Sequence, residues 1–449
     1  MKILFVRPKP HPNTIGLQSI MICEPLELEY LAAAIQDQHQ AVLVDLILEK
    51  KPLTHFIKLH RPQVVALTAY IAHVNVVKDY ARIIKKIDPQ IKVVLGGVHA
   101  DVVPEDFLDP HIDIIFSGNG IKNFAALMDL WEKDPLGSLK EKIIKGLGVP
   151  EIPSLFPLRS LTVKYRSRYY YLYHKPCALL KTSYGCPYSC SFCFCRQITE
   201  GQYRERDLDQ VIEELSEISE PEIYIVDDNF LVDPQRVDRF CTLLKAHGIK
   251  KGFLIYGRAD FIAQHEEIIA KFAAQGLRAV IVGVESPNPR ELEEYHKNSS
   301  VEINEKAIKI LRKYGIDCYA TMILGLDWDD RDFDHLSRWL REQKLRFVNL
   351  QPLTPLPGTP LFAKYQDSLA VPREKYEEWD LANLVVQPTR LSLSRYYYQI
   401  LKVYFRISLT PENIKGNLKY GFSLNLRIAL GVLRIIRQYL KKILGSKKP

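Results

Sequence analysis

The sequence predicts an α/β protein built from two successive domains and a basic helical tail. Short runs of β-branched residues alternate with amphipathic stretches twice along the chain, before residue 135 and again after residue 177. Continuous apolar strands separated by helices indicate parallel sheets covered on both faces. The chain of 449 residues is long enough for two or three domains, and its 47% of apolar residues suits globular cores. We therefore expect domains at 1–135 and 177–365, a connector at 136–176, and a helical C-terminal region at 366–449.

The first domain is predicted from five strand-like runs. These are KILFV (2–6), AVLVDL (41–46), VVALT (64–68), KVVLG (92–96) and DIIF (113–116). Between them, residues 25–34 and 74–87 carry apolar side chains at helical spacing. Five parallel strands fit a Rossmann-like or flavodoxin-like domain, in which a ligand binds beyond the carboxyl ends of the strands.

Small and glycine-rich segments follow three of these strands. They are TAY (68–70), GGVHA (96–100) and SGNG (117–120), and they contain the candidate residues Thr68, Gly96, Gly97, His99, Gly118 and Gly120. Glycine at such a strand end lets the backbone approach a flat or phosphorylated ligand. Plain strand-to-helix turns need the same glycines, so the glycines alone leave both interpretations open.

The second domain is predicted from six further strand-like runs that begin after a proline-rich connector. They are CALLKTS (177–183), EIYIVDD (222–228), GFLIYG (252–257), RAVIVG (278–283), CYATMILG (318–325) and FVNLQP (347–352). Helical patterns separate them, as in 207–218 and 234–247. Six such units predict a partial (β/α)6 barrel, and barrels of this kind carry their chemistry at the carboxyl ends of the strands.

The stretch SYGCPYSCSFCFC (183–195) holds four of the eight cysteines, directly after the first barrel strand. Such bunching points to metal ligation in a reducing cytosol rather than to a disulfide framework. Cys186, Cys190 and Cys193 have the spacing C-x3-C-x2-C, and no second pair follows to complete a structural zinc site. Three thiolates can instead hold three irons of a four-iron cluster and leave the fourth iron open to a small chelating ligand. Cys195 is expected to lie outside the ligand set.

This loop resembles the signature of the radical S-adenosylmethionine (SAM) superfamily, in which C-x3-C-x2-C follows the first strand of a partial barrel. An aromatic residue before the last cysteine, here Phe192, is also typical and is expected to contact SAM. The resemblance implies a [4Fe–4S] cluster held by the three cysteines, whose open iron binds the amino and carboxylate groups of SAM. One electron, from a donor such as flavodoxin or ferredoxin, then cleaves SAM to methionine and a 5′-deoxyadenosyl radical.

The carboxyl ends of the remaining barrel strands carry groups that suit SAM. We expect Asp227 in VDDNF, Arg258 in GRADF and Glu285 in GVES to contact it. Gly325 in ILGL is expected to leave space for the purine. A guanidinium pairs bidentately with a carboxylate, which suits the SAM carboxylate. Each group has a structural alternative, since acids cap helices and arginines bridge loops, but suitable groups at successive strand ends favour a binding site.

The order of the two domains resembles the cobalamin-binding branch of the superfamily. GRADFI, GVES and TPLPGTPLF (354–362) are similar to strand-end motifs of that branch. The resemblance implies that cobalamin binds at the glycine-rich strand ends of the first domain, with His99 packed beside the corrin. Two departures stand out. The motif D-x-H-x-x-G is absent, since KPHPNTIG (9–16) has its histidine in another frame, and the usual G-E-G-E appears as Gly118-Asn119-Gly120-Ile121.

The resemblance implies an enzyme that methylates an unactivated carbon of a small substrate, with cobalamin delivering the methyl group. An oxidative cyclase or rearrangement enzyme of the same build, as in tetrapyrrole synthesis, is the alternative. A methylthiotransferase is disfavoured, because those enzymes carry three further cluster cysteines in the N-terminal domain and residues 1–135 hold only Cys23. A non-catalytic iron–sulfur redox module would leave the strand-end acids and Arg258 unexplained.

The net charge of +8 is concentrated in the C-terminal tail. Residues 401–449 contain eleven Lys and Arg against one acidic residue, so they carry +10 and the preceding 400 residues carry −2. This distribution argues against a general nucleic-acid surface, and we expect no nucleic-acid partner.

Residues 424–444 predict an amphipathic helix, with Arg427, Arg434, Gln438 and Lys441 on one stripe and apolar residues around the rest. This pattern suits a helix lying in an anionic membrane surface, and a terminal helix packed on the body is an equal alternative. The arginines disfavour a membrane span, and no secretory signal is recognised. We expect a cytoplasmic protein with peripheral contact at the inner face of a membrane, acting on a lipid-like or other hydrophobic substrate.

Overall fold

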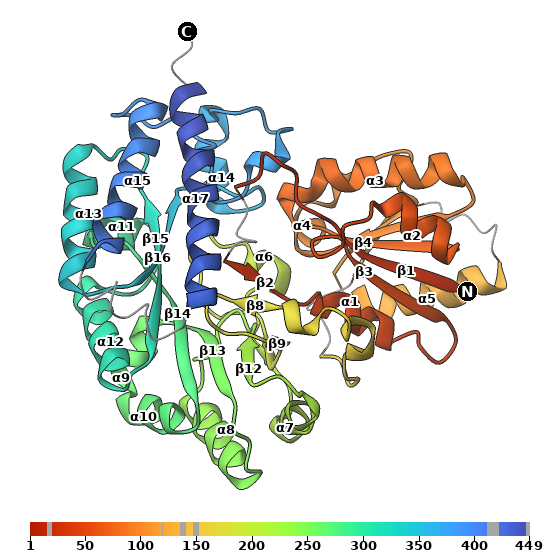
Figure 1. Ribbon diagram of the computed structural model, residues 1–449, viewed down its shortest axis with the longest axis horizontal. Coiled ribbons are helices and arrows are strands. Elements are labelled where there is room, and N and C mark those ends of the chain that lie inside the picture. The colour runs from red at the N-terminus through yellow and green to blue at the C-terminus, as the bar shows by residue number, and fades with distance from the viewer. Residues whose placement is uncertain (16–19, 119, 135–140, 147–151, 411–421, 446–449) are drawn as a thin grey trace.

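The computed structural model describes residues 1–15, 20–118, 120–134, 141–146, 152–410 and 422–445. Figure 1 shows two lobes joined by a connector: an N-terminal α/β domain in red and orange, and a larger barrel in green and blue. The α/β class and the order of the two domains are those predicted from the sequence.

The first domain is built on a parallel sheet with the strand order β3-β1-β4-β5-β6-β7. The strands are β1 (Lys2–Arg7), β3 (Gln40–Asp45), β4 (Val64–Thr68), β5 (Lys92–Gly96), β6 (Ile114–Ser117) and β7 (Ile143–Lys145). The five predicted strands are confirmed, and their order is flavodoxin-like. The sixth strand, β7, pairs with β6 beyond residue 135, inside the segment expected to be a connector. Three residues are too few to show a strand period in the sequence.

Helices cover both faces of this sheet because its strands point alternate apolar side chains to opposite sides. Leu4 and Val6 of β1 pack with helices α2 (Leu53–His60) and α3 (Val74–Ile87). Ile3 and Phe5 pack on the other face, against helices α1 (Leu26–Ala33) and α5 (Gly120–Lys133).

The second domain is a curved parallel sheet with the order β16-β15-β14-β13-β12-β9. Its strands are β9 (Cys177–Leu180), β12 (Glu222–Ile225), β13 (Gly252–Gly257), β14 (Leu277–Glu285), β15 (Asp317–Leu324) and β16 (Phe347–Pro352). Within the described residues, no hydrogen-bonded ladder joins β9 to β16. The predicted six-stranded partial barrel is therefore confirmed.

The barrel helices lie outside the sheet, and its inner face carries aromatic and aliphatic side chains. The outer helices are α7 (Leu208–Glu217), α8 (Pro234–Ala246), α9 (Ala259–Gln264), α10 (Glu266–Ala274), α11 (Pro289–Glu294), α12 (Val301–Lys313) and α13 (Asp330–Glu342). The inner cluster includes Tyr224, Leu254, Ile281 and Tyr319.

Short elements complete the two domains. The strands are β2 (Met21–Ile22), β8 (Tyr170–Tyr171), β10 (Ser183–Tyr184) and β11 (Arg204–Glu205). The helices are α4 (Val98–Val102), α6 (Cys195–Thr199) and α14 (Pro360–Tyr365). Single 3-10 turns lie at Ile71–His73, Pro104–Phe107, Arg159–Thr162, Arg166–Arg168, Gln366–Ser368 and Tyr376–Glu378.

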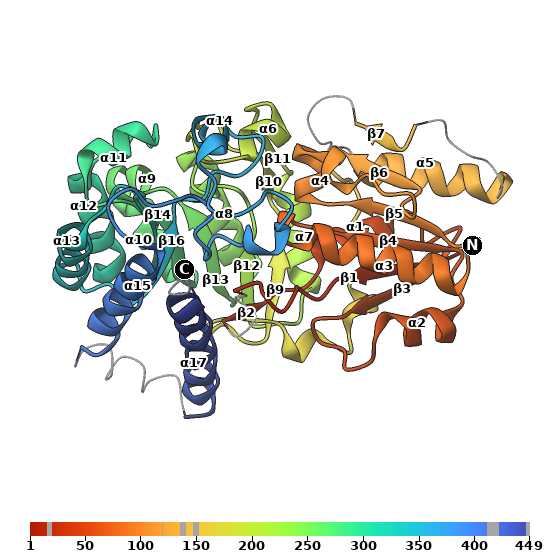
Figure 2. The ribbon, with the colours of Figure 1, turned by 90° about the horizontal axis from the view of Figure 1, so that it is seen from above.

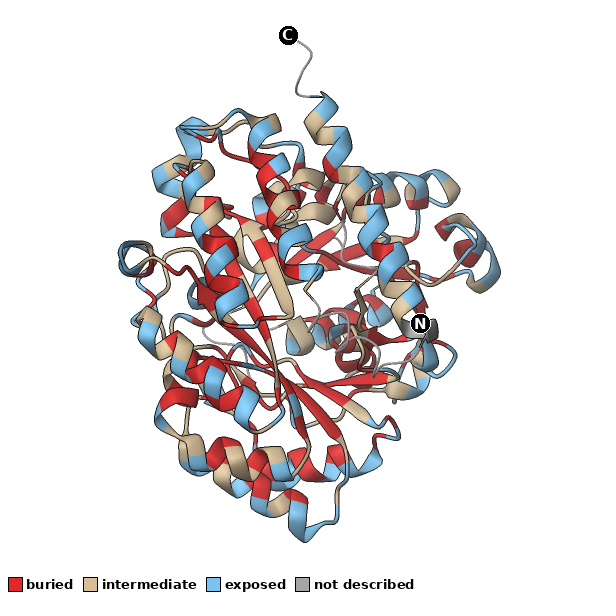
Figure 3. Cartoon of the chain, turned by 60° about the vertical axis from the view of Figure 1, so that its left-hand side comes forward, coloured by how far each residue is buried: buried red, intermediate tan, exposed pale blue. Residues whose placement is uncertain are grey.

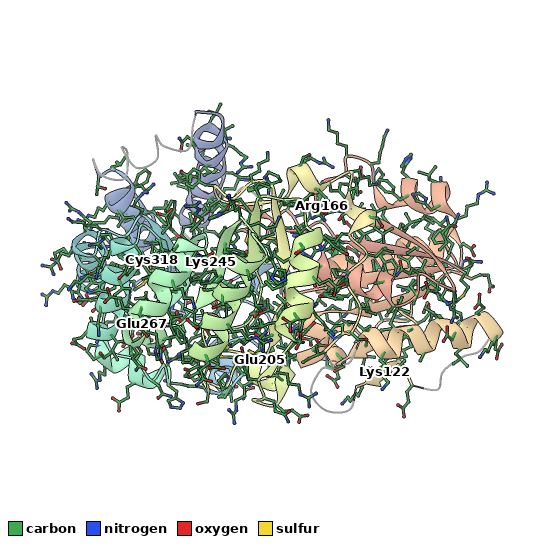
Figure 4. The ribbon with its side chains drawn as sticks, turned by 90° about the horizontal axis from the view of Figure 1, so that it is seen from below. Lys122, Arg166, Glu205, Lys245, Glu267 and Cys318 are labelled. Carbon is green, nitrogen blue, oxygen red and sulfur yellow. The ribbon has the colours of Figure 1, made fainter. Side chains whose placement is uncertain are left out.

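Two arginines of the connector tie the domains together. Arg159 donates to the Glu24 carboxylate at 2.6 Å and to the carbonyl oxygen of Leu179, in β9, at 2.7 Å. Arg166, marked in Figure 4 between the two domains, donates to the other oxygen of Glu24 at 3.0 Å. Because Glu24 is fully buried, these ion pairs hold the first domain against the first barrel strand.

Helices α15 (Leu393–Ser408) and α17 (Phe422–Gly445) cover the open side of the barrel. On the β16 edge, the Tyr404 hydroxyl of α15 accepts a hydrogen bond from the Leu350 amide at 3.0 Å. Tyr439 of α17 packs on Tyr397 of α15, with ring centroids 5.5 Å apart. Figure 2 shows both helices on the outside of the molecule. The alternative of a terminal helix packed on the body is therefore confirmed.

Candidate functional site

The cysteine loop leaves the barrel at the carboxyl end of β9 and is shaped by a tight turn. Strand β10 pairs with β11, which brings residue 202 close to Gly185. Gly185 has φ of +85°, and a Cβ there would collide with the backbone carbonyl of Gln202. Glycine is therefore required immediately before Cys186.

Asp227, predicted to contact SAM, anchors the start of this loop instead. Its buried carboxylate accepts hydrogen bonds from the Thr182 amide at 2.6 Å, the Thr182 hydroxyl at 2.5 Å and the Ser183 hydroxyl at 2.7 Å. The neighbouring Asp228 accepts from the Gly185 amide at 3.0 Å. The two acids that end β12 thus fix where the cysteine loop begins, and a SAM contact by Asp227 stays a prediction.

The three predicted ligands are partly exposed on one loop, whereas Cys195 is buried at the start of α6. Burial raises the pKa of Cys193 to about 11, and the neighbouring sulfurs of Cys190 and Cys186 add to the shift. Cys186, Cys190 and Cys193 are therefore close enough to influence one another electrostatically, as the predicted ligand set requires. The Cys195 amide donates to Cys193 Sγ at 3.4 Å, so Cys195 supports a ligand through its backbone.

The thiols suit a cluster better than a single ion. Within the described ranges, no three His, Cys, Asp or Glu side chains converge tightly enough to hold one metal ion. A four-iron cluster takes each cysteine on a different iron, so its ligands lie further apart. Iron ligation requires thiolates, so the cluster would have to stabilise the charged form that burial now disfavours at Cys193.

Arg258 binds the cysteine loop rather than lying free for a carboxylate. Its guanidinium stacks on the Tyr188 ring, 3.6 Å from the centroid. It donates to Asp260 at 2.8 Å and to the Lys297 carbonyl oxygen at 2.7 Å. Through these partners Arg258 joins the carboxyl end of β13 to the cysteine loop. If Arg258 also binds SAM, as predicted, its guanidinium must contact SAM and these partners at the same time.

Glu285, at the end of β14, forms a buried ion pair with Lys297 at 2.8 Å. Lys297 Nζ also lies 6.0 Å from the ring centroid of Phe192, and Phe192 packs edge-on against Tyr295. The carboxyl end of β14 and the last part of the cysteine loop therefore meet at Lys297. The sequence analysis missed Lys297, because it lies in a loop twelve residues beyond the strand-end pattern that pointed to Glu285.

At Gly325, predicted to leave space for a purine, one side of the backbone is occupied by Trp328. A Cβ at this position would collide with the indole of Trp328, so that side of the backbone is already filled. The Tyr396 hydroxyl donates to the Leu324 and Gly325 carbonyl oxygens, each at 2.9 Å. Gly325 is small because Trp328 packs on it.

The glycines of the first domain divide into two kinds. Gly97 has φ of +117°, and a Cβ there would lie 2.7 Å from the Ala69 carbonyl oxygen, so it is required by packing against the end of β4. Gly118 has φ of +77°, and its amide donates to Asp101 at 2.7 Å. By contrast, a Cβ at Gly120 meets no atom of the described residues within 4 Å. Gly120 is therefore a place where a ligand could approach the backbone.

The other candidate residues of this edge have partners inside the domain. The Thr68 hydroxyl donates to Glu27 at 3.1 Å, and Gly96 packs on Phe116. His99 is buried, with Nε2 2.9 Å from an Asp106 carboxylate oxygen. This contact holds the imidazole in place through one ring nitrogen, and the predicted role of His99 as a residue packed beside the corrin stays a prediction.

Each domain has a partly exposed tyrosine at the carboxyl ends of its strands. Tyr70, after β4, is 55% exposed, and Tyr256, in β13, is 38% exposed. Burial nevertheless raises the pKa of each phenol, and the Tyr256 phenol adds to the shift of Tyr70. Tyr256 of the barrel thus lies close enough to Tyr70 of the first domain to affect it electrostatically. The sequence analysis did not single out Tyr256, which it placed only within a strand.

Two family models match the two lobes. The radical SAM superfamily matches residues 180–340, and the B12 binding domain matches residues 13–128. The chain is a cobalamin-binding radical SAM enzyme. Its cofactors are accordingly a [4Fe–4S] cluster, SAM and cobalamin, and the non-catalytic redox module is set aside.

This radical SAM enzyme has relatives over most of its length. It is 28% identical over 417 residues to the hopanoid C-3 methylase of Methylococcus capsulatus, covering 90% of this chain and 79% of that protein. It is 23% identical over 421 residues to the anaerobic magnesium-protoporphyrin IX monomethyl ester cyclase of Cereibacter sphaeroides, covering 87% and 68%. The solved radical SAM methyltransferase TsrM of Kitasatospora setae, with cobalamin and [4Fe–4S] cluster bound, superposes with a TM-score of 0.67 at 16% identity. That superposition covers 92% of this chain and 91% of TsrM and shows the same fold.

The residues of this radical SAM enzyme fit these groups despite the two departures in motif. Three neighbouring thiols can hold the cluster, and the open backbone at Gly120 can lie against a corrin. The B12-domain match persists although the acids of G-E-G-E are missing. Asn119, one of the replacements, lies outside the described residues.

Proposed function

We propose that this enzyme transfers a methyl group to an unactivated carbon of a small hydrophobic substrate bound near Tyr70 of the first domain and Tyr256 of the barrel. The observation that carries the proposal is the exposure of both phenols, together with the electrostatic effect of Tyr256 on Tyr70. A substrate at this place would lie between the domain assigned to cobalamin and the barrel assigned to SAM.

The inner face of the barrel supports a flat or apolar substrate. Tyr256 packs on Tyr224 with ring centroids 5.9 Å apart, and Tyr224 packs on Tyr171 at 5.2 Å. Tyr171 then stacks on Tyr319 at 5.9 Å with an interplanar angle of 10°. Aromatic walls bury apolar ligands while their hydroxyl groups fix orientation. These side chains would orient the substrate and exclude water from the reacting carbon.

The protein's own part in the reaction is to hold its groups in place. When bound, the cluster and SAM supply a carbon radical that removes hydrogen from the substrate, and cobalamin supplies the methyl group. Asp227 and Arg258 hold the cysteine loop from two sides, and Lys297 holds Phe192 and Glu285 together. A one-electron donor such as flavodoxin or ferredoxin is part of the proposal.

Names of relatives support a polycyclic, hydrophobic substrate class. Hopanoids and magnesium-protoporphyrin esters are large apolar ring systems, and both similar proteins act on such molecules by name. A substrate of this kind would be met at a membrane surface. The similarity to the cyclase also favours a second candidate function, oxidative cyclisation without methyl transfer.

A labelling experiment separates the two functions. The full-length enzyme, purified without oxygen and loaded with cluster and cobalamin, is incubated with SAM carrying a deuterated methyl group, a low-potential reductant and a membrane-lipid extract. Methyl transfer should give 5′-deoxyadenosine, S-adenosylhomocysteine and deuterium in the organic phase. Formation of 5′-deoxyadenosine with unlabelled products would favour cyclisation or rearrangement instead. The Cys190→Ala variant is the control for background.

A further inference from the structure

Helix α17 turns a row of leucines away from the protein. Five leucines share this outer face and are between 44% and 66% exposed: Leu426, Leu430, Leu433, Leu440 and Leu444. We call them the leucine stripe. Their spacing of three, four or seven residues places them on one side of the helix. Figure 3 shows exposed residues along the helix that leads to the C-terminus. Large apolar side chains grouped in this way mark a contact surface.

The opposite face of α17 is fixed on the body, so the stripe cannot turn inward. Tyr439 is buried, and its hydroxyl donates to the Ala382 carbonyl oxygen at 3.3 Å. Arg427 lies over the Tyr170 ring at 3.6 Å and donates to the Leu172 carbonyl oxygen at 2.8 Å. These contacts anchor the helix at two levels along its length.

The polar stripe expected from the sequence lies along the border between the packed and the outer face of α17. Helical spacing keeps its four residues on one side of the helix. Arg427 and Gln438 bind the body, and Gln438 donates to the Thr14 carbonyl oxygen at 3.0 Å. Arg434 and Lys441 are exposed.

Exposed cations border the leucine stripe. Arg434, Arg437 and Lys441 are all exposed, and by helical spacing Arg437 falls within the stripe between Leu433 and Leu440. Residues 422–445 contain no acidic residue. The outer face of α17 is thus apolar along its centre and positive along one edge.

We propose that this outer face is an interfacial anchor that lies in the surface of an anionic lipid bilayer. The leucines would enter the boundary between headgroups and acyl chains, while the three cations bind lipid phosphates. In the described part of the chain, no helix is both long and apolar enough to cross a membrane. The contact is accordingly one along the surface.

Charge decides between a membrane and a second copy of this chain. If two stripes paired, Arg437 of each copy would be buried in the seam beside other cations, with no acid on the helix to pair with it. On a bilayer, the same arginine extends to the phosphates while its stem covers apolar surface. The anionic membrane is therefore the partner that fits.

The anchor is a property separate from the proposed methyl transfer. Its position on the protein would bring the barrel close to membrane lipid. Helix α17 lies at the open side of the barrel, beside the residues that precede β9. A bound bilayer would then face the gap between β9 and β16. The anchor can be measured without substrate, so its failure and a failure of methyl transfer are distinguishable.

Vesicle sedimentation with the full-length protein tests the anchor. Vesicles of phosphatidylcholine alone are compared with vesicles of equal parts phosphatidylcholine and phosphatidylglycerol, at low and high salt. We expect binding to the anionic vesicles only, weakened by salt. Leu430→Gln/Leu433→Gln/Leu440→Gln and Arg434→Gln/Arg437→Gln/Lys441→Gln should each lower the partition coefficient by about tenfold or more.

A matched control changes leucines that are equally exposed elsewhere. Leu59 and Leu130 are 62% and 45% exposed on the first domain, so Leu59→Gln/Leu130→Gln should bind like the unaltered protein. Unchanged melting temperatures would show that the variants fold. The proposal is overturned if the anionic vesicles do not bind the protein, or if the stripe and control variants bind alike. It is also overturned if sedimentation equilibrium shows a dimer that the stripe variant abolishes while vesicle binding is absent.

Discussion

The Arg258 guanidinium lies over the Tyr188 ring, with its Cζ 3.6 Å from the centroid, and so joins the third barrel strand to the loop that carries the predicted cluster cysteines. Tyr188 lies between Cys186 and Cys190. Arg258 is nearly buried and also pairs with Asp260 at 2.8 Å, so its position is fixed from two sides. The strand end thus positions the cluster ligands themselves.

Loss of Arg258 should therefore affect the cluster as well as SAM. Arg258→Ala removes the stacking on Tyr188 and leaves Asp260 without its partner, a loss of roughly 1.5–3 kcal/mol for a charged hydrogen bond. We expect less iron per chain after reconstitution and weaker SAM binding. Iron and sulfide assays with equilibrium dialysis of SAM measure both. Arg278→Ala, an exposed arginine of β14, is the control. Full iron content in Arg258→Ala would contradict a role in positioning the loop.

The three ligand cysteines and Cys195 should behave differently on substitution. Cys186→Ala, Cys190→Ala and Cys193→Ala should each abolish SAM cleavage, because each removes a thiolate from the cluster. Cys195→Ala should keep cleavage, because its contact with Cys193 is made by the backbone amide. Production of 5′-deoxyadenosine by the reconstituted proteins measures this. Cleavage by any of the first three variants would refute the ligand assignment.

Gly97 and Gly120 should respond in opposite ways to a side chain. Gly97→Val should lower stability by several kcal/mol, because φ is +117° and a Cβ meets the Ala69 backbone. Cobalamin loss in that variant would follow from misfolding. Gly120→Val has free space and should keep the melting temperature of the apoprotein while losing cobalamin. The visible spectrum after cobalamin loading measures retention, and normal retention in Gly120→Val would exclude this face as the corrin site.

Asp101 should make the first domain less stable as the pH rises. Burial raises its pKa from 3.8 to about 6, although the Gly118 amide donates to it at 2.7 Å. A carboxyl whose pKa is raised by folding binds its proton more tightly in the folded state, so stability present below pH 3.8 is lost as the pH rises through about 6.

The Asp101→Asn variant tests whether the charge of Asp101 lowers stability at high pH. The amide oxygen can still accept from the Gly118 amide, but it carries no charge. We expect a higher melting temperature than the unaltered protein at pH 8 and a similar one at pH 4. Thermal unfolding followed by circular dichroism at the two pH values measures the difference. An equal change in melting temperature at both pH values would show that the charge of Asp101 does not cause the difference.

The strand periodicity and the cysteine spacing could be predicted from the sequence because both are local. Five parallel strands and a six-stranded partial barrel follow from residues close together in the chain, as does the predicted ligand set of Cys186, Cys190 and Cys193. Strand β7 was missed because three residues carry no period.

Which side chains meet was decided by the tertiary structure. Arg258, Glu285 and Gly325 were located correctly at strand ends, but their partners Tyr188, Lys297 and Trp328 come from other elements or from the following loop. A strand-end position predicts that a group lies at the barrel mouth, and only the packing around it decides whether the group is free.

The same reasoning applies to helix α17. Its sequence determines an amphipathic helix, since apolar residues outnumber polar ones on every face but one. Because apolar residues lie on two sides of the helix, either side could be buried. The contacts of Tyr439 with Tyr397 and with the Ala382 carbonyl oxygen decide which side it is. Packing on α15 therefore turned the leucine stripe outward, which no local pattern could specify.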